Sequence, residues 1–263
     1  MKNTFLDKIR AGEKTVGTFF EMGSGAVGEV IGTTSLDYFI IDCEHGPYDI
    51  ETTAEIIRAA ENSGNGSVTA LARAKGIQRD AILKLLDIGA KGLIIPQVKT
   101  LEELQNIVRW GKYFPVGDRG YAWSRNNLFG RAEGADAGMK AWCAHCNEKQ
   151  LLIPQCETVE CLEHIEEFAL VEGIDGFFVG PNDLSIAMGI PGEFDSPDFL
   201  AALERIEKAV HKAGKFLMIY VDTPKIGIRR LQSGYDSVTV SVDACVYVNA
   251  LNRLVQDVKQ PDN

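Results

Sequence analysis

The segment DGFFVGPNDLS, residues 175–185, carries a carboxylate at the end of an apolar run. Its apolar part is typical of a strand buried on both faces, and the chain then turns through Gly-Pro-Asn to Asp183. A second carboxylate, Glu157, ends the apolar run over residues 151–157. If these runs are neighbouring strands, both carboxylates can bind one cation. Two carboxylate ligands, with water and substrate in the remaining coordination positions, are typical of an octahedral Mg²⁺ or Mn²⁺ site, whereas zinc would favour Cys or His ligands. The alternative for Asp183 is to cap the helix that follows it.

Polar residues also stand at the ends of other apolar runs: Asp42, Glu44 and His45 at the second, Arg73 at the third, Gln155 at the fifth and Asp222 at the seventh. A loop histidine such as His45 can transfer a proton near neutral pH if a carboxylate orients its ring. Arg73 can bind a carboxylate or polarise a carbonyl oxygen through its donor fork. The structural alternatives are a hydrogen-bonded histidine and an arginine held in a salt bridge. Gly180 lets backbone amides at a helix start approach an anionic ligand.

The elements that must position these residues alternate along the chain. Eight short apolar runs predict strands at residues 16–20, 37–42, 67–73, 92–96, 151–157, 176–180, 216–221 and 236–242. Helical patterns lie between them at residues 50–64, 79–92, 101–112, 159–173, 197–215 and 225–234. Eight such units in 263 residues predict a single α/β domain over residues 1–263, a (β/α)₈ TIM barrel. A doubly wound sheet would more typically have five or six strands and a Gly-rich nucleotide turn, and no such motif follows any run.

In a barrel, the carboxyl ends of the strands meet at one face, where active sites lie. One irregular segment, residues 112–150, separates the fourth and fifth predicted strands. We expect it over the carboxyl-end face, as a lid or as an arm toward a neighbouring subunit. Its WCAHC sequence has too few ligands for a structural zinc site, and we expect it to be structural, with free thiols.

Composition narrows the class of partner. A net charge of −10 argues against nucleic acid and anionic membranes, which favour basic patches. No apolar run approaches the roughly 18–20 residues that span a bilayer, and the charged N-terminus does not have the pattern of a signal peptide. A cytoplasmic enzyme acting on a small molecule is therefore the expectation.

Five motifs together resemble the HpcH/HpaI aldolase family of class II pyruvate aldolases: DCEHGPYD, LLDIGAKGLIIPQV, GDRGY, QCET and VEGIDGFFVGPNDLSIAMGIPG. The resemblance runs in order over roughly residues 5–255. It implies a TIM barrel of the phosphoenolpyruvate/pyruvate type and a divalent metal, Mg²⁺ or Mn²⁺ with Co²⁺ as a further option. It also implies a homo-oligomer, typically a hexamer, to which residues 112–150 could contribute.

The resemblance also implies a role for each matching residue. Glu157 and Asp183 would bind the metal, and His45 would be the general base, oriented by Asp42 and Asp87. Arg73 would lie near the reacting carbonyl, with Gln155, Gly180 and Asn182 contacting the pyruvate part of the substrate.

The expected reaction is retro-aldol cleavage of a 4-hydroxy-2-oxo acid to pyruvate and an aldehyde, through a metal-bound pyruvate enolate. One alternative at the same residues is decarboxylation of oxaloacetate or lyase chemistry on a malate-like acid. These reactions pass through the same kind of enolate intermediate as the aldol cleavage. A non-catalytic protein that binds 2-oxo acids is the second alternative. Departures from the family pattern at Asn182, at Arg73 and in the loop over residues 119–131 leave the aldehyde unassigned.

Overall fold

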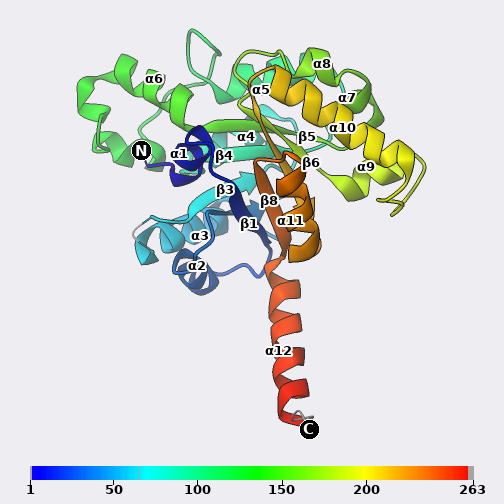
Figure 1. Ribbon diagram of the computed structural model, residues 1–263. Coiled ribbons are helices and arrows are strands. Elements are labelled where there is room, and N and C mark those ends of the chain that lie inside the picture. Colours follow the sequence, from blue (N-terminus) through cyan, green and yellow to red (C-terminus); the bar gives the residue numbers. More distant parts are fainter. Residues whose placement is uncertain (1, 65, 260–263) are drawn as a thin grey trace.

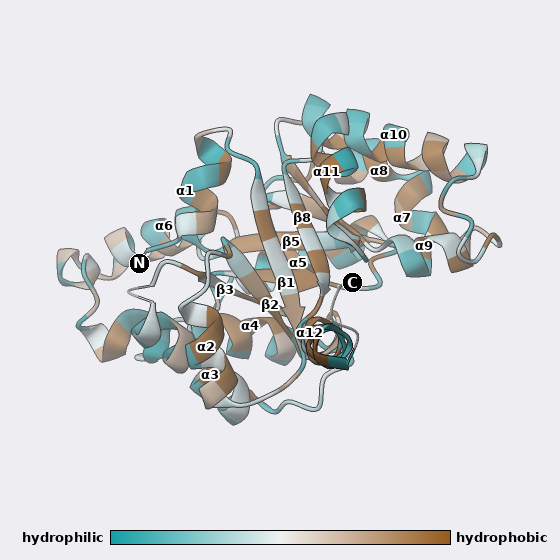
Figure 2. Ribbon diagram, turned by 60° about the horizontal axis from the view of Figure 1, so that its bottom comes forward, coloured by the Kyte–Doolittle hydropathy of each residue, from teal (hydrophilic) through white to brown (hydrophobic). Residues whose placement is uncertain are grey.

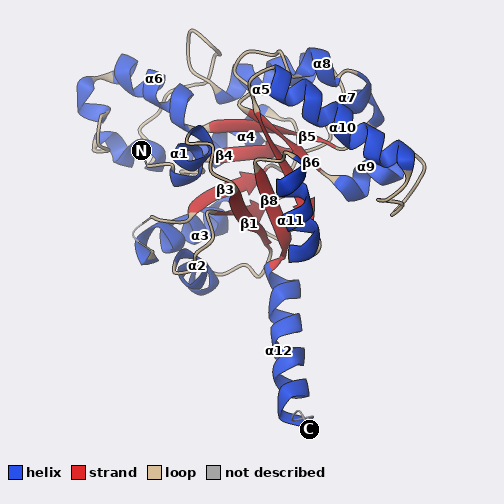
Figure 3. Ribbon diagram, in the orientation of Figure 1, coloured by secondary structure: helices blue, strands red, loops and turns tan. Residues whose placement is uncertain are grey.

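Eight parallel strands close into a barrel in the order of the chain, from β1 round to β8 and back to β1 (Figures 1 and 3). The computed structural model describes residues 2–64 and 66–259. The strands are β1 Thr15–Phe20, β2 Tyr38–Asp42, β3 Thr69–Arg73, β4 Gly92–Ile95, β5 Leu151–Cys156, β6 Gly176–Val179, β7 Phe216–Val221 and β8 Ser237–Val242. The predicted barrel and its eight strands are confirmed.

Two apolar layers explain why these runs form strands. Inside the barrel, side chains such as Ile40, Ile94 and Phe178 form one buried cluster, and α1 closes the amino end by adding Phe5 and Leu6. A larger cluster fills the space between the strands and the surrounding helices. Each strand therefore buries both faces, which is why it reads as a continuous apolar run rather than an alternating one.

Helices connect the strands: α1 Thr4–Arg10, α2 Gly25–Gly32, α3 Ile50–Ser63, α4 Arg79–Asp87, α5 Leu101–Gly111, α6 Met139–Lys149, α7 Val159–Glu163, α8 Ile165–Phe168, α9 Pro181–Ala187, α10 Pro197–Lys212, α11 Pro224–Ser233 and α12 Asp243–Lys259, with 3₁₀ helices η1 Arg125–Gly130 and η2 Ala135–Ala137. The helix expected over residues 159–173 is two helices that meet at His164. The sequence patterns missed α2, α6 and α12.

The segment over residues 112–150 lies at the amino end of the barrel, so its expected position over the carboxyl-end face is wrong. Asn3 donates from Nδ2 to the carbonyl of Lys149 at 2.8 Å, and Gln150 donates to the carbonyl of Ala90 at 3.0 Å. Figure 1 accordingly places α6 beside the N-terminus, away from the start of α12. The reason is topological: this segment follows α5, and a helix in this fold returns the chain to the amino end.

The last helix, α12, leaves the barrel instead of packing along it (Figures 1 and 3). Tyr247, Leu251, Leu254 and Val258 recur at helical spacing and are 44–74% exposed. Figure 2, which looks nearly along this helix, shows apolar residues gathered on one side of it. None of the described helices combines the length and apolar character that crossing a bilayer requires.

Candidate active site

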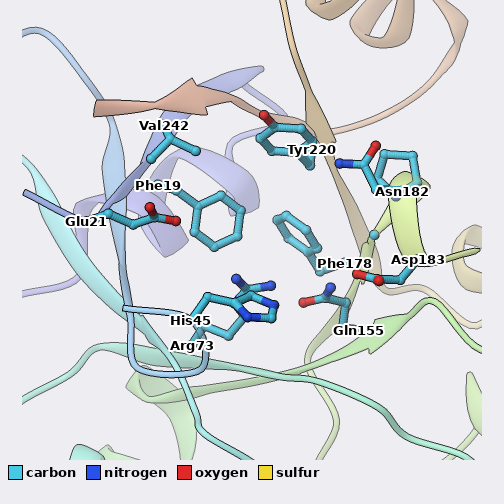
Figure 4. Close-up of a pocket in the computed structure, with 12 residues that line it drawn as sticks. Phe19, Glu21, His45, Arg73, Gln155, Phe178, Asn182, Asp183, Tyr220 and Val242 are labelled. Atoms are coloured by element: carbon cyan, nitrogen blue, oxygen red, sulfur yellow. The ribbon is translucent and has the colours of Figure 1, made fainter. Parts of the chain in front are cut away.

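A cavity of about 200 Å³ opens at the carboxyl ends of the strands (Figure 4). It is smaller than the roughly 300–1,000 Å³ of drug-sized ligand sites, so it suits an acid of a few carbons. Its lining comes from β1, β3 and β5 to β8, from α9, and from the loop after β2. Six predicted site residues line it: His45, Arg73, Gln155, Gly180, Asn182 and Asp183.

Glu157 lies behind Gln155 and is 2% exposed. Its Oε1 accepts hydrogen bonds from the backbone N–H of Gln97 at 2.8 Å and from Nε2 of Gln97 at 3.1 Å. Its Oε2 accepts from Nε2 of Gln155. Burial raises the pKa of Glu157 to about 7; the charges of Asp183 and Glu44 also raise it, while the hydrogen bond from the Gln97 amide and the charge of Arg73 lower it. None of the ion pairs among the described residues includes this carboxylate.

Asp183 does not cap α9. The N-cap of this helix is Gly180, no side chain bonds to its first turn, and Asp183 is a first-turn residue that lines the cavity. The capping alternative is therefore wrong, and the carboxylate is available to a ligand. A Cβ at Gly180 would come within 2.6 Å of Nε2 of Gln155 and 2.7 Å of Oε2 of Glu157, so a side chain there would displace the polar ends of both residues.

Asp42 and Arg73 form a buried pair at the ends of β2 and β3. Nε and Nη2 of Arg73 donate to the two carboxylate oxygens of Asp42 at 2.8 and 2.5 Å. Burial alone would raise the pKa of Asp42, but the hydrogen bonds and charge of Arg73 hold it below its ordinary value. Nη1 of Arg73 lies 3.2 Å from Oε2 of Glu44, and the guanidinium lies 4.7 Å from the centroid of the Phe19 ring. The salt-bridge alternative for Arg73 holds, yet the side chain also lines the cavity.

His45 is exposed in the loop after β2 and lines the cavity. The backbone N–H of His45 donates to Oδ1 of Asp42 at 3.3 Å, and that of Glu44 donates to the same oxygen at 3.0 Å. Asp42 therefore fixes the backbone of the loop that carries His45, and it does not orient the imidazole ring.

Asp87 and Asp222, both singled out in the sequence, do not line this cavity. Asp87 ends α4 at the amino end of the barrel, where its Oδ1 accepts from Nη2 of Arg119 at 2.7 Å. The structure does not bring Asp87 to His45 of the same chain, so a role for it at the site would require a second copy. Asp222 lines a smaller adjoining pocket with Asn182 and Tyr220.

Sequence reasoning missed Glu21, Gln97 and Tyr220. Glu21 follows β1 and lines the cavity, and its backbone N–H donates to Oδ1 of Asp243 at 2.8 Å. Gln97 follows β4 in a left-handed conformation with φ of 57°, which aims its backbone N–H at Glu157. The sequence did contain a signal for Glu21 and Gln97, because each is a polar residue that directly follows an apolar run, as do the predicted site residues at the other strand ends.

A profile of the HpcH/HpaI aldolase/citrate lyase family matches residues 16–250. The chain belongs to this family. It is 30% identical over 265 residues to 2-keto-3-deoxy-L-rhamnonate aldolase of Escherichia coli (strain K12), covering 100% of this chain and 96% of that protein. It is 32% identical over 256 residues to hydroxypyruvate/pyruvate aldolase of Agrobacterium fabrum, covering 96% and 92% of the two chains.

The crystal structure of the HpcH/HpaI aldolase from Desulfitobacterium hafniense DCB-2 superposes with a TM-score of 0.88. The two chains are 27% identical, and the match covers 100% of this chain and 99% of the other. This HpcH/HpaI protein is thus an enzyme of the carbon–carbon lyase type, which excludes the alternative of a binding-only protein.

Proposed function

We propose that the protein is a divalent-metal-dependent aldolase that cleaves a 4-hydroxy-2-oxo acid to pyruvate and an aldehyde. The observation that carries the proposal is Glu157, a carboxylate 2% exposed, with no ion-pair partner among the described residues and a second carboxylate, Asp183, nearby. A buried charge is normally paired or bound to a metal. Glu157 and Asp183 would hold a divalent cation, whose charge would offset that of the two carboxylates.

The donor set fits a hard dication. It consists of two carboxylates and the Oε1 atom of Gln155, a buried acceptor with no hydrogen-bond partner. Oxygen donors without thiolate or imidazole suit Mg²⁺ or Mn²⁺. The described residues contain no group of three or more His, Cys, Asp and Glu side chains that could hold a metal. Water and the 2-oxo acid would therefore complete the coordination, which leaves room for a substrate. When bound, the cation supplies Lewis-acid stabilisation of the negative charge that develops on the oxo oxygen.

The chain's own residues supply the remaining steps. Gln155 and the backbone around Gly180 and Asn182 hold the 2-oxo acid at the ends of β5 and β6. His45 removes the proton from the C4 hydroxyl, directly or through a water molecule. The C3–C4 bond breaks, its electron pair forms the enolate of pyruvate, and C4 leaves as the aldehyde carbon. Arg73, fixed by Asp42, donates an N–H to the oxo oxygen as its charge grows.

The cycle closes when the enolate takes a proton at C3 and becomes pyruvate, the proton coming from protonated His45, directly or through a water molecule, which regenerates the base. In the reverse direction the enolate attacks an aldehyde, and the alkoxide takes the proton from His45. Atoms and charge balance in both directions without an oxidant or a covalent enzyme intermediate.

Metal removal tests the proposal. The protein dialysed against EDTA should form no pyruvate from 4-hydroxy-2-oxo acids, and Mg²⁺ or Mn²⁺ should restore the activity. Full activity in the stripped protein would reject the proposal. Oxaloacetate in the same assay separates decarboxylation from aldol cleavage, since the enolate is shared and only the leaving group differs.

We also propose that the protein is a homo-oligomer, as the resemblance to hexameric aldolases implies. The apolar side of α12, formed by Tyr247, Leu251, Leu254 and Val258, faces solvent in a single chain. Burying such a side is what stabilises an amphipathic helix in a protein. A second copy offers the surface that covers it.

A further inference from the structure

The cavity has two chemically different walls on opposite sides of the barrel. In a ring of eight strands in chain order, β1 stands four strands from β5, directly across the barrel. Gln155 of β5 and Asp183 beyond β6 form one wall, where the proposed function places the 2-oxo acid. Glu21 beyond β1, with Val242 of β8, forms the other (Figure 4).

A 4-hydroxy-2-oxo acid bound at the first wall must extend toward the second. His45 follows β2, between the two walls, and it meets the C4 hydroxyl in the proposed reaction. The carbons beyond C4, which leave as the aldehyde, therefore point toward Glu21, Phe19 and Tyr220. Phe19 separates the two regions, since its ring contacts those of Phe178 at 5.9 Å and Tyr220 at 6.0 Å between centroids.

Glu21 gives this second wall a negative charge without a partner. The carboxylate forms no ion pair within the part of the chain that the structure describes. Among the described residues, Arg73 is the only Lys or Arg side chain that lines the cavity, and it is already bound to Asp42 and Glu44. Asp243, whose carboxylate accepts the N–H groups of Glu21 and Met22, adds a second negative charge behind the wall.

We propose that Glu21 selects the aldehyde, favouring uncharged hydroxyaldehydes and rejecting aldehydes that carry a carboxylate or a phosphate. A hydroxyl group donates a charge-assisted hydrogen bond to the Glu21 carboxylate. An anionic group in the same place meets a like charge in a partly desolvated cavity, where such repulsion discriminates strongly. The substrates are then 2-oxo acids whose distal part is a neutral polyol, not 2-oxo diacids. This inference rests on the proposed aldolase function.

The test compares two aldehydes of nearly equal size, glycolaldehyde and glyoxylate, as acceptors for pyruvate in the presence of Mn²⁺. The measured quantity is the ratio of the two kcat/KM values, which does not depend on the fraction of active enzyme. Glu21→Gln should shift this ratio toward glyoxylate by at least about tenfold, and Glu21→Ser should shift it in the same direction. Glu21→Asp, which keeps the charge, should retain the wild-type preference.

Glu29→Gln is the matched control, because it removes the same charge from an exposed position on α2. An unchanged ratio in both neutral variants at residue 21, or an equal shift in Glu29→Gln, would overturn the inference. Exchange of the C3 protons of pyruvate with deuterated water, measured on the wild-type protein, separates the two proposals. If the wild-type protein exchanges the C3 protons but the kcat/KM ratio is the same in the Glu21 variants, only the role of Glu21 is rejected. If the wild-type protein shows no exchange and forms no product with either aldehyde, the aldolase function is rejected and this inference with it.

Discussion

Arg73 donates to both carboxylate oxygens of Asp42, and the two side chains are 9% and 0% exposed. This pair joins the ends of β2 and β3, because Asp42 and Arg73 are also register partners in the sheet. It therefore supports both the shape of the barrel mouth and the position of the guanidinium in the cavity.

Removing one member of this pair should cost stability. Asp42→Ala leaves the buried Arg73 with only Glu44 as a partner, and the free energy of unfolding should fall by about 3–5 kcal/mol. Urea unfolding monitored by circular dichroism measures this. Glu44→Ala is the control, since its more exposed pair with Arg73 should contribute less than about 1 kcal/mol. Equal losses in the two variants would contradict the assignment of Asp42 as the main partner.

His45→Ala should lower turnover by roughly 10²–10⁴-fold, the range for loss of a general base. Because His45 is not among the proposed metal ligands, Mn²⁺ affinity should stay within about threefold of wild type, as isothermal titration calorimetry would show. Undiminished turnover would mean that another group takes the proton.

Glu157→Gln should weaken Mn²⁺ binding by at least about 100-fold, because a carboxylate ligand becomes a neutral amide. The same change should stabilise the metal-free protein by about 1–3 kcal/mol at neutral pH, since it removes a buried charge whose pKa is raised to about 7. Calorimetry measures the first effect, and denaturant unfolding in EDTA measures the second. A variant that binds Mn²⁺ normally would exclude Glu157 as a ligand.

The pair formed by His211 and Asp236 should make stability depend on pH. Nε2 of His211 lies 3.0 Å from Oδ2 of Asp236, and this hydrogen bond raises the pKa of His211 against the effect of burial. A raised pKa in the folded state stabilises the protein below the unfolded pKa of about 6.5, and this contribution is lost as pH rises through the folded value. Both groups are partly exposed, so we expect about 0.5 kcal/mol.

Urea unfolding between about pH 6 and pH 8.5 measures this contribution. The difference between wild type and His211→Gln should shrink as the pH rises through that window. A difference that stays constant, or that grows, would contradict the sign derived from the raised pKa.

The apolar side of α12 should hold the oligomer together. Leu251→Lys combined with Leu254→Lys should reduce the particle mass toward the 28.8 kDa of one chain, as measured by light scattering after size exclusion. Asn249→Lys, an exposed change on the opposite side of the helix, should leave the mass unaltered. A wild-type protein that is already monomeric would reject the proposal.

The barrel could be predicted from the sequence because each strand buries both faces and its residues are therefore uniformly apolar. The residues at its carboxyl end followed from the same reasoning, which located Gln155, Glu157 and Asp183 at neighbouring strand ends. Gln97 was harder to find. Its hydrogen bond to Glu157 depends on a left-handed backbone conformation, which a glutamine in the sequence does not predict.

One error came from neglecting the direction of the chain. Residues 112–150 follow a helix and so lie at the amino end of the barrel. Asp87 ends a helix at the same end, so its assignment, which came from the family resemblance, stays a prediction that requires a second copy. The direction of α12 could not be predicted for a different reason. The sequence pattern of an amphipathic helix does not determine whether its apolar side packs on its own barrel or on another surface.

The hydrogen bonds between Asp243 and the backbone of Glu21 and Met22 tie the last strand of the ring to the first. The wall proposed to select the aldehyde therefore depends on the junction that closes the ring. The residues proposed to hold the 2-oxo acid stand on the far side of the barrel, so a change at this junction should alter the choice of aldehyde before it alters binding of the 2-oxo acid.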